Sequence, residues 1–97
     1  MIKTTAIRAR IFVDGAEATS EFVAACWFDP PAANKDGNWG GQFRLNEPPK
    51  RGIMVSQCEL RLTDGTTGTI VVSKLVNGRD GVFIGSGDPP AIVANAK

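Results

Sequence analysis

The sequence of 97 residues contains no histidine and no tyrosine, and its only cysteines are Cys26 and Cys58. Histidine is the side chain that most often acts as a general base at neutral pH and as a ligand of transition metals. Its absence excludes Ser-His-Asp and Cys-His catalytic sites within this chain, and two thiols are too few for a structural zinc site. We therefore expect no enzymatic activity, no metal site and no cofactor.

Cysteine is also too scarce for a disulfide scaffold, and the two residues do not form a C-x-x-C motif. We expect Cys26 and Cys58 to be reduced core residues, because free cysteine is among the most buried residue types. A disulfide between them is the alternative. The N-terminus carries charge at Lys3 and has no long apolar run, so it predicts no secretory signal. The expected location is the cytoplasm.

An excess of one charge is missing as well. Lysine and arginine number 11 and aspartate and glutamate number 10, so the net charge is +1. This balance disfavours nucleic acid or an anionic membrane as a partner held by bulk charge, and no apolar stretch approaches the ~20 residues of a membrane helix. Hydrophobic residues make up 42% of the chain, and this fraction and the length predict one globular domain over residues 1–97.

Long hydrophobic runs are absent because turn-forming residues interrupt the chain at short intervals. Asp-Gly and Asn-Gly pairs favour turns with positive φ, and an acidic residue before two prolines marks the end of a strand or a loop. The pairs occupy positions 14–15, 36–37, 64–65, 77–78 and 80–81, and the double prolines occupy positions 30–31, 48–49 and 89–90. Such short spacing predicts strands.

Alternation of apolar and polar residues between these turns predicts six strands. The expected strands are 5–13, 19–28, 42–45, 54–62, 69–76 and 81–85. We expect an all-β fold, a small six-stranded antiparallel barrel of OB-like or SH3-like size, because six strands can close and so remove exposed edges. Residues 91–97 are expected to form a loose C-terminal tail.

A helix is the alternative for the second strand. Asp14 and Glu17 have the spacing of a capping box, and the segment after them is rich in alanine. An α+β fold with one helix at about 16–27 would follow. The strand is favoured because Asp14-Gly15 follows a clear strand and because the segment ends in aromatic and other β-forming residues.

Acidic residues supply no convincing catalytic or metal site. Each candidate aspartate precedes glycine or proline, a position at which it sets turn geometry. Asn34, Asp36 and Asn38 alternate as in a calcium loop, but Trp39 and Leu45 stand where such a loop requires glycine and glutamate. We expect a solvated turn there. The aspartates considered as carboxylate pairs are Asp29, Asp36, Asp64, Asp80 and Asp88.

Aromatic and basic residues are concentrated between Trp39 and Arg51. Tryptophan and arginine exposed in a loop are enriched at binding hot spots. The predicted binding residues are Trp39, Phe43, Arg44, Lys50 and Arg51. The alternative role for Trp39 is to pack over the end of the barrel.

Two functions fit these residues. The first is a non-enzymatic protein-interaction or assembly module, in which Trp39, Phe43 and an edge strand contact a protein partner or a second copy of the chain. The second is a ligand-binding barrel for oligosaccharide or single-stranded nucleic acid, in which Trp39 stacks on the ligand and the basic residues recognise its charge.

Overall fold

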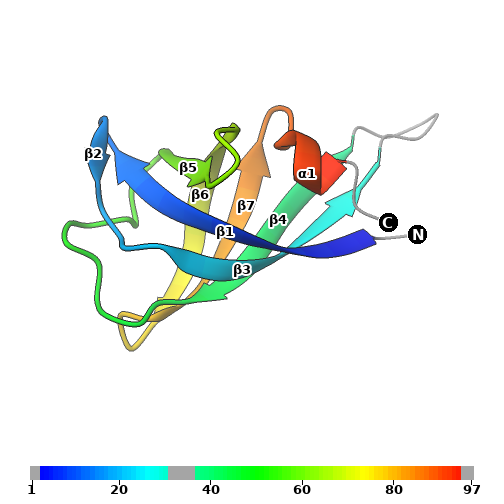
Figure 1. The fold of residues 1–97 in the computed structure, drawn as a ribbon. Helices are drawn as coiled ribbons and strands as arrows, with labels where there is room; N and C mark the ends of the chain where they lie inside the picture. The colour runs from blue at the N-terminus through cyan, green and yellow to red at the C-terminus, as the bar shows by residue number, and fades with distance from the viewer. Residues whose placement is uncertain (1–2, 31–36, 95–97) are drawn as a thin grey trace.

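The structure is a computed structural model that describes residues 3–30 and 37–94. These residues form seven strands and one short helix (Figure 1). The elements are β1 (Lys3–Val13), β2 (Ala16–Glu17), β3 (Phe22–Asp29), β4 (Asn38–Arg44), β5 (Cys58–Leu62), β6 (Thr67–Val76), β7 (Asp80–Ser86) and α1 (Ala91–Ala94). No helix in the described residues is long and apolar enough to cross a membrane.

Six of these strands close into an antiparallel barrel. In the described residues their order around the barrel is β1-β3-β4-β7-β6-β5, and pairing of β1 with β5 completes the circle. The short β2 extends the sheet beside the end of β1. Strands β1, β3 and β4 form one three-stranded meander, and β5, β6 and β7 form another. Residues 45–57 connect the two meanders, and the β4–β7 and β1–β5 pairs join them into the barrel. The prediction of an all-β six-stranded barrel is confirmed.

The helix considered for residues 16–27 is not formed. β3 pairs along its length with β1 on one side and with β4 on the other. Phe22, Ala24 and Cys26 point into the core with exposed fractions of 4% or less, while Val23 and Ala25 point outward. Tertiary pairing on both edges therefore outweighs the helix propensity of the alanine-rich segment.

Positive φ angles confirm two of the predicted turns. Asp14 and Gly15 have φ of 52° and 81°, and Asn77 and Gly78 have φ of 55° and 70°. Consecutive positive φ values are the geometry of the tight hairpin turn that matches strand twist. The turn expected at Asp80-Gly81 is wrong, because both residues lie in β7.

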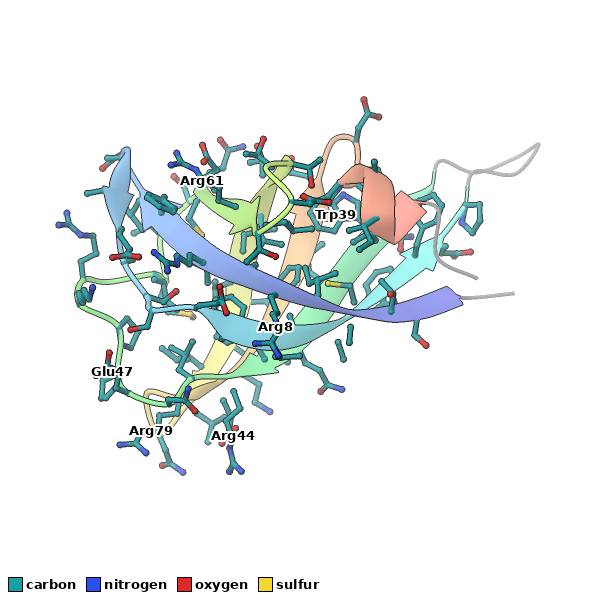
Figure 2. All side chains as sticks on the ribbon, viewed as in Figure 1. Arg8, Trp39, Arg44, Glu47, Arg61 and Arg79 are labelled. Carbon is teal, nitrogen blue, oxygen red and sulfur yellow. The ribbon has the colours of Figure 1, made fainter. Side chains whose placement is uncertain are left out.

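The indole of Trp39 fills the barrel interior beside α1 (Figure 2) and is 1% exposed. Its ring occupies the space that a side chain at Gly85 would need, and a Cβ at Gly68 would lie 2.8 Å from its Cη2 atom. The indole Nε1 donates a hydrogen bond of 3.0 Å to the carbonyl oxygen of Gly87. The indole fits inside the barrel because β6 and β7 carry Gly68 and Gly85 at the positions that face it.

The same arrangement continues along the β4–β7 ladder. Phe83 faces Gly41, and Phe43 faces Gly81. The Phe83 ring lies 6.2 Å from that of Phe43 and 6.1 Å from that of Trp39, between ring centroids. Each inward aromatic of this ladder thus has a glycine opposite it, and the three rings form one continuous row in the core.

The largest differences between predicted and observed strand boundaries are at the starts of β4 and β5. β4 begins at Asn38 instead of residue 42, so Trp39 lies in a strand and not in a loop. β5 begins at Cys58 instead of residue 54, because the chain bends at residues 55–56 and residues 54–57 form no strand. The segment expected as a loose tail begins with α1, whose Val93 is fully buried; residues 95–97 lie outside the described part of the chain.

One edge stays open although the barrel closes. Pairing of β5 with β6 ends at Cys58 and Ile70, whereas β6 continues to Val76. Among the described residues, no backbone hydrogen bond joins residues 71–75 to the connection between β4 and β5. The expectation that closure removes all exposed edges is therefore wrong for this half of β6. A β-bulge between Val72 and Lys74 lies in this half of the strand.

Both cysteine side chains are buried as free thiols. Burial raises the pKa of Cys26 to about 12 and that of Cys58 to about 11. The neutral thiol is thus the form that the folded core accepts.

We expect Gly85→Ala to lower the free energy of unfolding by about 2 kcal/mol or more, because its methyl group would overlap the Trp39 ring. Urea unfolding followed by circular dichroism measures the change. Gly52→Ala is the control, since nothing lies within 4 Å of a Cβ there. Equal stability of the two variants would contradict the packing of Trp39 against Gly85.

We expect alkaline pH to weaken folding through the two thiols. Their pKa values lie above the ordinary value of 9.0 in the folded chain, so the unfolded chain loses these protons first and stability falls as pH rises above 9. The loss is about 1 kcal/mol per thiol by pH 10. A Cys26→Ala, Cys58→Ala variant should show a smaller decrease between pH 7.5 and 10 in urea unfolding. The same decrease in both proteins would refute this account.

Candidate functional site

Two of the five predicted binding residues are core residues. Trp39 is 1% exposed and Phe43 is 5% exposed, because both occupy inward positions of β4. Neither ring can stack on a ligand in this structure. The prediction of an exposed aromatic loop is therefore wrong, and the alternative role of Trp39 as a core residue at the end of the barrel is the one observed.

The three predicted basic residues are exposed but do not form one cluster. Arg44 ends β4 and pairs with Asp80 of β7, with 2.9 Å between Nε and Oδ1. Lys50 lies near β2 and donates a hydrogen bond of 3.0 Å to Glu17. This bond holds the pKa of the Glu17 carboxyl below its usual range. Arg51 is exposed beside Lys50 in the connection between β4 and β5.

The structure instead gathers apolar side chains on the outside of the barrel. Across β3, β4, β7 and β6, the residues that point away from the core fall into three rows set by the strand register. Among the exposed ones, Val23 is 51%, Ile84 45% and Val76 41% accessible. We call all residues of the three rows, including Ala6 of β1, the outer surface. The rows are Trp27, Gly40, Ile84 and Val71; Ala6, Ala25, Gln42, Val82 and Lys74; and Val23, Arg44, Asp80 and Val76.

A shallow hollow of about 540 Å³ lies over the middle and last rows of the outer surface. Ala6 and Ala25 line one side of it and Val82 and Val76 line the other, with Gln42 between them. Small side chains on β1 and β3 beside larger ones on β6 and β7 make the surface concave. A concave apolar area with a few polar groups is typical of binding sites.

Trp27 is the aromatic residue of the outer surface. It is half-buried, and its ring lies over Gly40, since a Cβ at that glycine would lie 2.8 Å from the indole Cζ2 atom. The register also places Ile84 beside Gly40 on the far side. Alternation in the second predicted strand already separated Trp27 from the face that carries Cys26. Both faces of that strand are apolar, so the pairing of β3 with β4 was needed to show which face points outward.

Three basic residues lie at the edge of the outer surface, and we call Arg8, Arg44 and Lys74 the border. Arg8 and Arg44 each have an acidic neighbour, Glu21 at 3.5 Å and Asp80 at 2.9 Å respectively. Lys74 on β6 completes this border, and among the described residues no acidic group pairs with it. The border therefore carries an excess of positive charge.

The described residues hold no group of three or more histidine, cysteine, aspartate or glutamate side chains that could bind a metal ion. Asp64 accepts hydrogen bonds from the hydroxyl and the backbone N–H of Thr66, and these bonds lower its pKa. This carboxylate shapes its own turn, as the sequence predicted. Asn34 and Asp36 of the calcium-like segment lie outside the described residues.

We expect acrylamide to quench only part of the tryptophan emission, because Trp27 is half-buried on the outside and Trp39 is fully enclosed. Trp27→Phe should remove the quenched component and leave the resistant one. Stern–Volmer plots of both proteins measure this difference. Strong quenching in the Trp27→Phe variant would place Trp39 at the surface and contradict the assignment.

Comparison with known proteins adds no relative to this description. No protein-family model, no curated protein and no solved structure matches the chain.

Proposed function

We propose that the chain is a non-enzymatic protein-interaction module of the cytoplasm, which binds an apolar segment flanked by acidic residues in a partner protein. The observation that carries this proposal is the outer surface, where Trp27 lies beside exposed Ile84 and the hollow next to it has apolar walls. The reduced state of Cys26 and Cys58 supports a cytoplasmic location.

The apolar side chains of this surface can supply binding energy. Full burial of an exposed valine or isoleucine contributes about 1.5–3 kcal/mol relative to its exposure to water. Trp27 is held against Gly40 before any partner arrives, so little side-chain entropy is lost on binding. A partner that covered Trp27, Val23 and Ile84 would therefore gain more binding free energy than it would from scattered surface residues.

The charge of the border supports an acidic partner. Lys74 and Arg44 line the hollow, and Arg8 lies in a neighbouring hollow that Arg44 also lines. Acidic groups beside the apolar segment of a partner would complement these cations and raise the association rate. A basic partner would meet like charges there.

The hypothesis of an oligosaccharide or nucleic-acid ligand loses its stacking residues. It depended on Trp39 and Phe43, both of which are enclosed in the core. The interior is filled by their rings and by Phe83, so a ligand would have to bind the outside of the barrel. The near-neutral charge of the whole chain offers no general attraction to nucleic acid.

We expect a random peptide library, selected on the immobilised protein, to yield peptides with a large apolar residue next to aspartate or glutamate. Ile84→Thr should weaken the binding of these peptides about tenfold, because it removes an exposed apolar side chain from the row that holds Trp27. Fluorescence anisotropy of labelled peptides gives the affinity. A blue shift of the Trp27 emission should accompany binding and disappear in Trp27→Phe.

Ile92→Thr is the matched control, because Ile92 is 42% exposed on α1, outside the outer surface. It should bind the selected peptides as the wild type does. Equal loss in Ile84→Thr and Ile92→Thr, or peptides without acidic residues, would overturn the proposal. So would tighter binding of a single-stranded oligonucleotide, or a dimer in sedimentation that Ile84→Thr dissociates, since each would assign the surface to another occupant.

A further inference from the structure

A second hollow, of about 600 Å³, lies at the end of the barrel where β4 ends and the β6–β7 hairpin turns. The backbone N–H of Leu45 donates a hydrogen bond of 2.9 Å to the carbonyl oxygen of Arg79, which ties these two segments together. The Leu45 side chain is 3% exposed, and it anchors the end of β4 in the core. The floor of the hollow is therefore part of the folded barrel.

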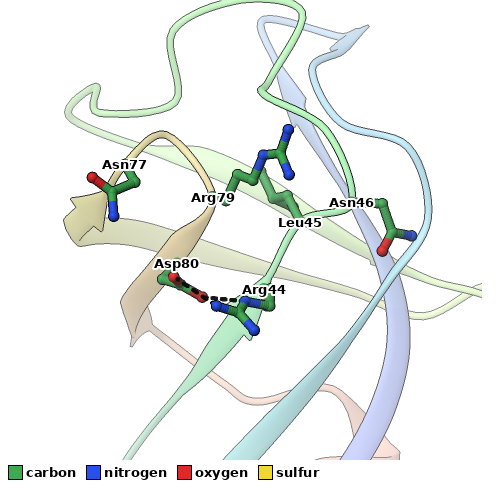
Figure 3. A pocket seen from close by; sticks show the side chains of 6 residues that line it. All are labelled: Arg44, Leu45, Asn46, Asn77, Arg79 and Asp80. Carbon is green, nitrogen blue, oxygen red and sulfur yellow. Dashed lines mark hydrogen bonds and ion pairs between the residues drawn. The ribbon is translucent and has the colours of Figure 1, made fainter.

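Four of the six side chains around this hollow carry hydrogen-bond donors. The guanidinium groups of Arg44 and Arg79 flank Leu45, and the amides of Asn46 and Asn77 lie on either side (Figure 3). Asp80 is the one carboxylate in the lining. The positive φ of Asn77 and of the glycine after it turns the chain so that Arg79 reaches this end.

Asp80 engages only part of the donor capacity. It accepts hydrogen bonds from Nε and Nη2 of Arg44, at 2.9 and 3.5 Å. The Arg44 side chain is 79% exposed, so solvent screens this pair and a competing anion can reach the guanidinium. Arg79 forms no ion pair among the described residues, although Asp80 follows it in the sequence. The lining thus holds two cations and one anion, and planar guanidinium groups match the geometry of oxyanions.

The hollow is continuous with the outer surface. Arg44 and Asp80 line both hollows, so one partner can occupy the two together. We propose that the end hollow is an oxyanion subsite that takes a carboxylate of the partner, and this inference rests on the proposed function. Arg79 supplies the free charge, and Arg44 exchanges Asp80 for the incoming carboxylate.

We expect a blocked di-glutamate peptide to shift the side-chain NMR signals of Arg44, Arg79, Asn46 and Asn77 in the full chain. Arg79→Gln should weaken this binding about threefold, and Asp80→Asn should strengthen it about threefold, the size expected of an exposed charge. The opposite signs separate a subsite from a structural ion pair, because a structural role for Asp80 would not predict tighter binding without it.

Arg61 and Glu59 provide matched controls. They form an ion pair of 2.6 Å on β5, and Arg61 lies at the other end of the barrel in Figure 2. Arg61→Gln and Glu59→Gln change the net charge as the two test variants do, and they should leave the affinity unchanged. Equal effects at both ends would overturn the subsite.

A blocked di-glutamine peptide and inorganic phosphate complete the experiment. Two outcomes would overturn the assignment to a carboxylate. In the first, the di-glutamine peptide shifts the NMR signals as much as the di-glutamate peptide does, and in the second, phosphate shifts them but the di-glutamate peptide does not. Ile84→Thr should keep the di-glutamate shifts while it weakens the binding of the selected peptides about tenfold. A protein that binds di-glutamate at the end hollow but yields no selected peptides would therefore refute the proposed function and retain the oxyanion site.

Discussion

The alternation of aromatic ring and glycine across the β4–β7 ladder is the constraint on which this barrel depends. A closed sheet of six strands encloses a narrow interior, because the diameter of a barrel grows with its number of strands. Trp39, Phe83 and Phe43 enter that interior at successive inward positions, and the residue facing each ring is glycine. Two aromatics at one level would overlap, and two glycines would leave a void. The three rings therefore also fix the register of the central strand pair.

A filled interior places any binding function on the outside. The outer surface uses the same pairing of ring and glycine, with Trp27 lying on Gly40. On the inside this pairing makes room for the ring, and on the outside it supports an aromatic side chain that would otherwise move freely in solvent. The protein thus presents a preorganised aromatic side chain next to Ile84 and the apolar hollow, which agrees with the interaction function proposed above.

Local patterns in the sequence were sufficient for the barrel but not for the site. Alternation and Asp-Gly or Asn-Gly turns predicted the strands, because both act within a few residues. Trp39 was misplaced because its glycine-rich neighbourhood resembles a loop, whereas these glycines face aromatic rings that are distant in sequence. Antiparallel register pairs Trp27 with Gly40 and Phe28 with Trp39, so the two indoles lie on opposite faces. Only the pairing of β3 with β4 reveals which tryptophan is outside.

The open edge of β6 bears on how a partner can approach. An uncovered edge offers backbone groups to any extended chain, and natural sheets discourage such pairing with bulges and lysine. The half of β6 that has no partner strand on the β5 side has both features. A bulge separates Val72 from Lys74, and the lysine side chain is exposed. Strand addition is disfavoured there, while the outward side chains of the same strand remain accessible. Lys74 thus discourages pairing along the edge and adds positive charge to the outer surface, which supports docking through side chains on the face of the barrel.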